Sequence, residues 1–187
     1  RAMEPLYVIF SSDHGEMLGD HHLFRKSLGY EASSHVPLFI SGYNVDLSPG
    51  ESDALCSWED VLPTVADLAG VPLPGPVDGR SLAPALRGDP LEARESIYGL
   101  CFGMHKNHFI VWDRYKYIWF PESGEEQVFD LIEDPSETRD LSGNETLLAE
   151  LRKQMVAADP VTGKQPYDPA VAVPCANAWP SVFGAST

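Results

Sequence analysis

The sequence is poor in basic residues and has no long apolar run. Only 13 Lys and Arg residues stand against 28 Asp and Glu residues, which gives a net charge of −15 at pH 7. The basic residues form no local cluster, and so acidic a surface repels a phosphate backbone, so nucleic acid is not expected as a partner. No segment approaches the roughly 18 consecutive apolar residues of a membrane-spanning helix, so no membrane span is predicted.

Cysteines are also few. Cys56, Cys101 and Cys175 are widely spaced and odd in number. They form neither a CxxC metal motif nor a disulfide framework. We expect the three cysteines to be small buried side chains. The N-terminal stretch RAMEPLYVIF lacks the charged, apolar and cleavage regions of a signal peptide.

The segment from Leu6 to Lys26, LYVIFSSDHGEMLGDHHLFRK, concentrates ionisable residues beside an apolar run. The run from Leu6 to Phe10 is followed by Ser and Gly, which predicts a strand buried on both faces, as in the parallel sheet of an α/β protein. Ligands bind beyond the carboxyl ends of strands in such sheets. Asp13 and His14 follow this strand directly and are therefore candidates for a ligand site.

Strand and helix signals alternate up to about residue 93. Val36 to Ser41 predicts a second strand, and Ser57 to Ala69 predicts a helix with one apolar face. Ser57 and Asp60 have the spacing of a capping box, and Gly70 is a helix stop. A Pro-rich connector then leads to a short helical turn at 81–87.

From about Ser96 the pattern changes to four short β-prone runs, SIYGLCF, HFIVWD, YKYIWF and QVFDL. Their spacing and the turn PESGEE predict an antiparallel meander. The DPSE segment at Asp134 has the spacing of a helix start, and Asn144 to Ala157 predicts an amphipathic helix. The remainder up to Thr187 is rich in Pro, Ala and Gly and predicts an extended surface tail.

The segment SSDHGEMLGDHHLFRKSLGYEASSHVPLFISG resembles the C-terminal signature region of the sulfatases and the related phosphonate and phosphodiester hydrolases of the alkaline-phosphatase-like superfamily. The resemblance continues through DVLPTVADLAGVPLPGPVDGRSLAPALRG, RYKYIWF, VFDL and DPSETRDL. It implies an α/β fold, part of a mixed or parallel sheet with flanking helices, followed by a small antiparallel sheet packed with a helix. We expect residues 1–93 to belong to the catalytic α/β domain, 94–157 to form the meander with its helix, and 158–187 to form the tail.

The resemblance also implies roles for single residues. Asp13 matches an acidic metal ligand, His14 matches the next position, which is Asn or His in the family, and Lys26 matches the lysine that contacts sulfate or phosphate oxygens. A carboxylate and an imidazole suit a divalent metal ion, with calcium the first expectation and manganese or zinc the alternatives. An ammonium suits a tetrahedral oxyanion. Lys26 and Asp13 are the catalytic candidates, with Asp13 orienting or deprotonating the nucleophile.

Each assignment has a structural alternative. Asp13 could cap the turn after the strand, His14 could pack or support a ligand, and Lys26 could be an ordinary surface lysine. For His21 and His22, hydrogen-bonding support of the loop is favoured over metal ligation, because the family completes its metal site with carboxylates outside this segment. His21 is in addition a candidate for substrate binding.

The sequence departs from the family in one respect. Sulfatases use a formylglycine nucleophile made from a C-x-P/A-x-R motif, and none of CSWED, CFGMH and CANAW has this pattern. The family's early pair of metal-binding Asp residues also has no match. The chain is therefore expected to be the C-terminal part of a larger enzyme, with the formylglycine and further metal ligands in a missing N-terminal segment. Because a signal peptide would lie there too, the sequence does not indicate a cellular location.

The predicted function is hydrolysis of a sulfate ester of a small molecule or carbohydrate, with this chain contributing half of the divalent-metal and sulfate site. A phosphonate or phosphodiester hydrolase of the same superfamily is the near alternative, because sulfate and phosphate are both tetrahedral oxyanions. A non-catalytic metal- or partner-binding remnant is the alternative from another class. The absence of the nucleophile motif favours the remnant, whereas the joint presence of Asp13, His14 and Lys26 opposes it.

Overall fold

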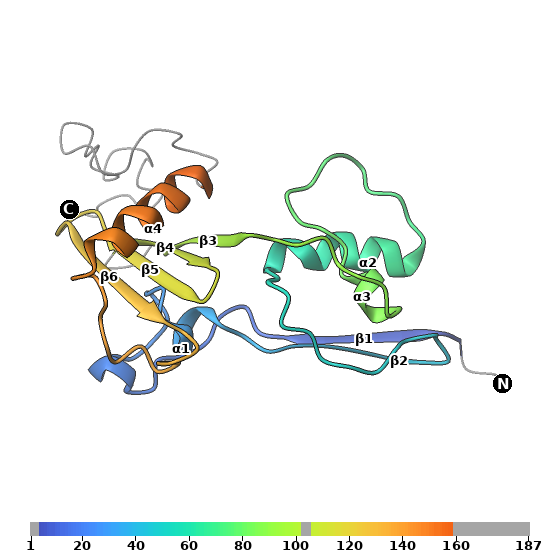
Figure 1. The fold of residues 1–187 in the computed structure, drawn as a ribbon. Helices are drawn as coiled ribbons and strands as arrows, with labels where there is room; N and C mark the ends of the chain where they lie inside the picture. The colour runs from blue at the N-terminus through green and yellow to red at the C-terminus, as the bar shows by residue number, and fades with distance from the viewer. Residues whose placement is uncertain (1–3, 102–105, 159–187) are drawn as a thin grey trace, which may run out of the picture. The chain divides into compact units, whose positions relative to one another are not determined.

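The computed structural model describes residues 4–101 and 106–158 of the 187-residue chain. These residues form two compact units, each built around its own sheet: residues 4–26 and 31–97 belong to the first, and residues 27–30 join the rest of the chain in the second (Figure 1). In chain order the elements are β1 (Leu6–Ser11), η1 (Asp20–His22), α1 (Glu31–Ser34), β2 (Leu38–Tyr43), η2 (Trp58–Asp60), α2 (Val61–Ala69), α3 (Ala83–Leu86), β3 (Ser96–Cys101), β4 (Asn107–Trp112), β5 (Tyr115–Phe120), β6 (Glu125–Asp130) and α4 (Glu145–Ala158).

The first unit contains a two-stranded antiparallel sheet in which β1 pairs with β2, with Ile9 opposite Ile40. Along β1 the side chains alternate between exposed and partly buried, so one face of the strand is covered and the other is open. The prediction of a strand buried on both faces in a parallel sheet is therefore wrong for β1 in the part of the chain that the structure describes. A continuous apolar run does not distinguish a doubly buried strand from one with an uncovered apolar face.

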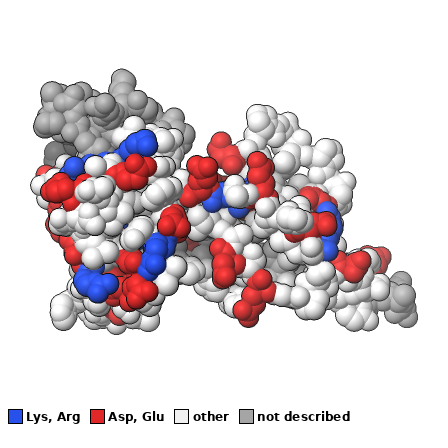
Figure 2. Space-filling model, viewed as in Figure 1, with Lys and Arg blue, Asp and Glu red and all other residues white. Residues whose placement is uncertain are grey.

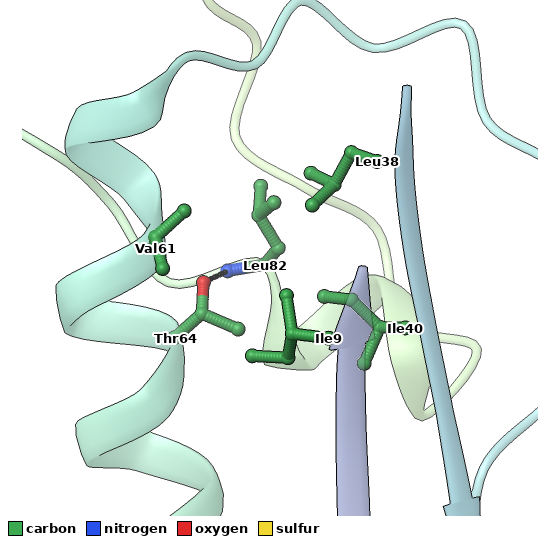
Figure 3. Close-up of a pocket in the computed structure, with 6 residues that line it drawn as sticks. All are labelled: Ile9, Leu38, Ile40, Val61, Thr64 and Leu82. Atoms are coloured by element: carbon green, nitrogen blue, oxygen red, sulfur yellow. Dashed lines mark hydrogen bonds between the residues drawn. The ribbon is translucent and has the colours of Figure 1, made fainter. Parts of the chain in front are cut away.

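The covered face of this sheet packs against helices of the same unit. Figure 3 shows strand and helix side chains converging around a small apolar pocket lined by Ile9, Leu38, Ile40, Val61, Thr64 and Leu82. Thr64 Oγ1 also accepts a hydrogen bond of 2.9 Å from the backbone N–H of Leu82. This bond ties α2 to the segment that enters α3.

The buried carboxylate of Asp60 organises the start of α2. The Ser57 N–H donates to Asp60 Oδ2 over 2.9 Å and closes the predicted capping box. Arg94 donates to both carboxylate oxygens over 2.6 and 2.7 Å, and the Arg80 N–H donates over 2.8 Å. The helix ends at Gly70, whose φ of 65° is the left-handed conformation of a helix stop. The predicted helix and its two ends are confirmed.

The second unit is the predicted meander. Its four strands lie in the order β3-β4-β5-β6, and α4 packs against the sheet. Asn144 Oδ1 accepts the Leu147 N–H over 3.2 Å and caps the start of α4. The meander and the amphipathic helix are confirmed. Their shared core consists of Ile110, Tyr117, Val128, Leu148, Leu151 and Met155.

The short segment 27–30 joins the second unit through Asn107, which is fully buried. The Asn107 side chain accepts from the Gly29 N–H over 3.0 Å and donates to the Ser27 carbonyl over 3.1 Å. Lys26, the last residue before this segment, belongs to the first unit. The chain therefore passes between the units at the peptide bond after Lys26.

The helix start predicted at Asp134 is wrong. The Asp134 carboxylate accepts from the Thr138 hydroxyl over 2.9 Å and from the Arg139 N–H over 2.7 Å, and so closes turns instead. Glu137 has a φ of 55°, which lies in the left-handed region and redirects the chain. A helix therefore cannot continue through this segment.

Two of the three cysteines lie in the described residues. Cys56 and Cys101 are free and partly buried, and burial raises the pKa of both thiols. This agrees with the small buried side chains expected from the sequence. Cys175 and the predicted tail beyond Ala158 lie outside the described residues, and Ala158 itself ends α4.

Charged side chains of both signs are interspersed on the face drawn in Figure 2, where Lys and Arg lie beside acidic residues. Ion pairs among the described residues include Arg114 with Asp130 and Arg87 with Asp67. Within residues 4–101 and 106–158, no helix has the length and apolar character that crossing a bilayer requires.

Asp60→Asn is expected to lower the stability and to flatten its dependence on pH. Burial by itself raises the pKa of Asp60, but the hydrogen bonds from Arg94, Arg80 and Ser57 outweigh it, so the pKa lies below its usual value. Such a carboxyl stabilises the fold above its unfolded-state pKa of about 3.9, and this contribution is lost as the pH falls through the folded-state pKa. Leaving Arg94 without its partner should cost about 3 kcal/mol of unfolding free energy at pH 7.

Urea unfolding between pH 7 and pH 3 measures both effects. Asp53→Asn, at an exposed position, is the control and should stay within about 0.5 kcal/mol of the wild type. If Asp60→Asn loses stability with acid as steeply as the wild type does, the interpretation of Asp60 is contradicted.

Candidate functional site

The structure brings Asp13, His14 and Lys26 together just beyond the end of β1. Lys26 Nζ lies 2.5 Å from His14 Nε2, and His14 Nε2 lies 3.5 Å from Asp13 Oδ2. Lys26 follows His14 by twelve positions, so the intervening loop folds back onto the strand end. A carboxylate, an imidazole and an ammonium therefore meet at one place in the first unit.

Hydrogen bonds determine which nitrogen of His14 carries the proton. Nδ1 lies 2.7 Å from the carbonyl oxygen of Gly15, and a carbonyl only accepts, so Nδ1 donates. In the neutral ring Nε2 then carries the lone pair, and it accepts from the Lys26 ammonium. The Nε2 lone pair of His14 thus lies on the side of the ring that faces Lys26 and the carboxylate of Asp13.

The site is accessible to a ligand. The Asp13 side chain is 82% exposed and the His14 side chain is 35% exposed. Among the residues that the structure describes, no three His, Cys, Asp or Glu side chains are grouped so that they could hold a metal ion. Asp13 and His14 offer two ligands, and a hard divalent ion needs several more.

The turn that carries Asp13 and His14 is held from two sides. The Ser12 hydroxyl donates to the His14 carbonyl over 2.7 Å. The indole Nε1–H of Trp58, in η2, donates to the Ser12 carbonyl over 2.8 Å. The carbonyls of the residues before and after Asp13 are therefore both hydrogen-bonded.

Gly15 brings this turn into close contact with α1. Its N–H donates to the Ser33 carbonyl over 2.9 Å. A Cβ at Gly15 would lie 2.0 Å from the carbonyl oxygen of Ala32, so no larger residue fits without moving the turn.

The loop between His14 and Lys26 is closed as a hairpin. The Met17 N–H donates to the Arg25 carbonyl over 2.9 Å, and the Arg25 N–H donates to the Glu16 carboxylate. Met17 is buried and anchors the base of the loop. His21 and His22 lie at its tip in η1, both with left-handed φ, and their roles in loop support and substrate binding stay predictions.

Sequence reasoning missed the supporting residues Ser12, Gly15 and Trp58. The capping box of CSWED placed Trp58 at the start of a helix. Nothing in the sequence indicates that this helix start lies beside the end of β1, because the contact joins residues 46 positions apart.

Comparisons with known proteins identify the family. The family model described as N-sulphoglucosamine sulphohydrolase, C-terminal, matches residues 19–159. This chain belongs to the sulfatases. An arylsulfatase from Clostridium perfringens is 39% identical to it over 142 residues, which cover 73% of this chain and 29% of that protein.

Solved structures agree with this sulfatase assignment. A 2-O GAG sulfatase aligns with a TM-score of 0.73 and 26% identity, covering 81% of this chain and 35% of that one. A protein solved with its substrate D-glucosamine-2-N,6-O-disulfate aligns with a TM-score of 0.69 and 25% identity, covering 90% of this chain and 36% of that one. The predicted sulfatase α/β fold is confirmed. This chain covers less than a third of the length of the Clostridium perfringens arylsulfatase.

Gly15→Ala is expected to displace the turn that carries Asp13 and His14. The added Cβ would clash with the carbonyl of Ala32, so the unfolding free energy should fall by about 1–3 kcal/mol in urea denaturation. The matched control is Gly50→Ala, whose Cβ would meet no atom within 4 Å. Equal effects of the two substitutions would show that the close approach at Gly15 is unimportant.

Proposed function

We propose that this sulfatase chain supplies the sulfate-binding lysine and two metal ligands to an active site that hydrolyses a sulfate ester. The convergence of Asp13, His14 and Lys26 at the end of β1 carries this proposal. The kinship with an arylsulfatase supports the reaction class. The three side chains combine a cation site with an anion site, which is what an ester of a tetrahedral oxyanion needs.

Lys26 binds the sulfate group. Its ammonium has three N–H donors, and one of them is directed at His14 Nε2. The others are available for ester oxygens, whose negative charge grows as the S–O bond breaks. Stabilising that charge in the transition state is the catalytic contribution of Lys26.

Asp13 and His14 fit a divalent cation as part of its ligand set. Asp13 presents exposed carboxylate oxygens, and His14 presents a neutral Nε2 whose tautomer is held by the Gly15 carbonyl. Calcium is the first candidate, with manganese and zinc as alternatives. A bound divalent cation polarises the ester oxygens as a Lewis acid. Ligation through Nε2 would take up the lone pair that accepts from Lys26 in this structure, and all three N–H donors of the ammonium would then be available for ester oxygens.

The nucleophile comes from the N-terminal part of the enzyme, as a formylglycine in our proposal. The exposed carboxylate of Asp13, just beyond the end of β1, is proposed to orient or deprotonate this nucleophile. His21, at the tip of the hairpin, is proposed to contact the substrate.

The uncovered face of the β1–β2 sheet is proposed to bind that N-terminal part. Leu6 lies opposite Tyr43 and Phe10 opposite Phe39, and all four side chains are at least 50% exposed. Phe10 and Phe39 are in ring contact, with centroids 6.0 Å apart. An apolar patch of this kind marks an interaction surface, and less than a third of a curated relative's length is present here to cover it.

The substrate is proposed to be a sulfated carbohydrate or another small sulfate ester. A structural relative that aligns with 90% of this chain was solved with a disulfated glucosamine as its substrate. Lys26 binds the sulfate group, which all such esters share, so the rest of the substrate is selected by other parts of the enzyme.

The isolated chain is expected to show no turnover of an aryl sulfate, because the nucleophile and the remaining metal ligands are absent from it. Adding the separately produced N-terminal part of a related arylsulfatase should restore turnover, measured by release of the phenol. The N-terminal part alone is the control. Turnover by the isolated chain would contradict the proposal, and preferential hydrolysis of a phosphonate monoester by the complex would change the substrate class.

Lys26→Met in the complete enzyme is expected to lower kcat/KM for a sulfate ester by roughly 10²- to 10³-fold, the usual effect of removing one stabilising donor. Metal affinity should not fall, because Lys26 is not a ligand and its ammonium competes with the cation for the Nε2 lone pair of His14. Lys153→Met, at an exposed position on α4, is the control and should leave kcat/KM unchanged. A Lys26→Met enzyme with wild-type kcat/KM would remove Lys26 from the mechanism.

A further inference from the structure

Trp58 lies beside the site without belonging to the chemistry proposed above. It is the first residue of η2 and is 50% exposed. Its indole has a single donor, the Nε1–H, and this donor is used on the Ser12 carbonyl at 2.8 Å. The bond reaches the residue that immediately precedes Asp13.

The bond from Trp58 is one of two that hold the backbone on either side of Asp13. Ser12 accepts from Trp58 with its carbonyl and donates with its hydroxyl to the carbonyl of His14, over 2.7 Å. The position of the Asp13 Cα, and with it the space that the carboxylate can reach, depends on the backbone conformation of these three residues. A loose Ser12 carbonyl would let Asp13 and His14 turn away from each other.

The backbone around Trp58 is held by hydrogen bonds. Asp60, two residues further on, is fully buried and accepts hydrogen bonds from Ser57, Arg80 and Arg94. The η2 turn that carries the indole is therefore fixed from both sides of Trp58 in the sequence. The indole N–H of Trp58 therefore has a fixed position, and its hydrogen bond fixes the position of the Ser12 carbonyl.

We propose that Trp58 is a positioning residue, whose indole N–H holds the Ser12 carbonyl and so sets the geometry in which Asp13 and His14 bind a divalent cation. This inference rests on the function proposed for Asp13 and His14. It assigns Trp58 no contact with the substrate or the metal.

The test uses the complete enzyme, stripped of metal and titrated with Ca²⁺ or Mn²⁺ in a calorimeter. Trp58→Phe keeps a ring but removes the N–H, and the loss of one hydrogen bond should weaken metal binding roughly 3- to 10-fold. Trp58→His keeps an N–H at the equivalent ring position, so it should recover most of the affinity. At saturating metal, kcat of Trp58→Phe should return to within about twofold of the wild type, because the ligands themselves are unchanged.

Two further variants separate the possible failures. Trp112→Phe, in β4 of the second unit, is the matched control for losing an indole and should leave metal affinity unchanged. Asp13→Asn tests the underlying site: if it does not weaken metal binding, the proposed metal site is wrong. If Asp13→Asn weakens binding but Trp58→Phe does not, or if Trp58→His is as weak as Trp58→Phe, the positioning role of Trp58 is overturned and the metal site stands.

Discussion

The fully buried carboxylate of Asp60 is the constraint on which the first unit depends. A buried charge is very costly unless it is paired and hydrogen-bonded, so Asp60 requires Arg94, and the N–H groups of Ser57 and Arg80, to come together. These partners lie up to 34 positions away in the sequence. Their convergence fixes the start of α2 and, with it, the turn that presents Trp58 to the end of β1.

The features that depend on neighbours in the sequence could be predicted. The capping box of Ser57 and Asp60, the stop at Gly70 and the meander follow from local chemistry, and the structure has all of them. The signals at Asp134 were equally local but misleading, because the left-handed Glu137 turns the chain before a helix can form. A local sequence pattern indicates which secondary structure a segment favours. One residue in a left-handed conformation can prevent that structure from forming.

The candidate site was predictable from the sequence only as a set of residues. The resemblance to sulfatases indicated Asp13, His14 and Lys26 as site residues. It did not indicate that His14 directs its Nε2 lone pair at Lys26. That orientation depends on the carbonyl of Gly15. The support from Trp58 was not predictable, because a contact between an indole and a distant backbone carbonyl leaves no pattern in the sequence. The uncovered face of β1 was missed because an apolar run looks the same whether or not its cover is present.

The segment 27–30 gives the site a mechanical link to the rest of the chain. Lys26 ends the first unit, and one peptide bond later Ser27 is held by the buried amide of Asn107. The backbone immediately after Lys26 is thus held by a side chain of the meander. The last residue of the candidate site and the first residue of the second unit are consequently neighbours in the sequence, joined by a single peptide bond.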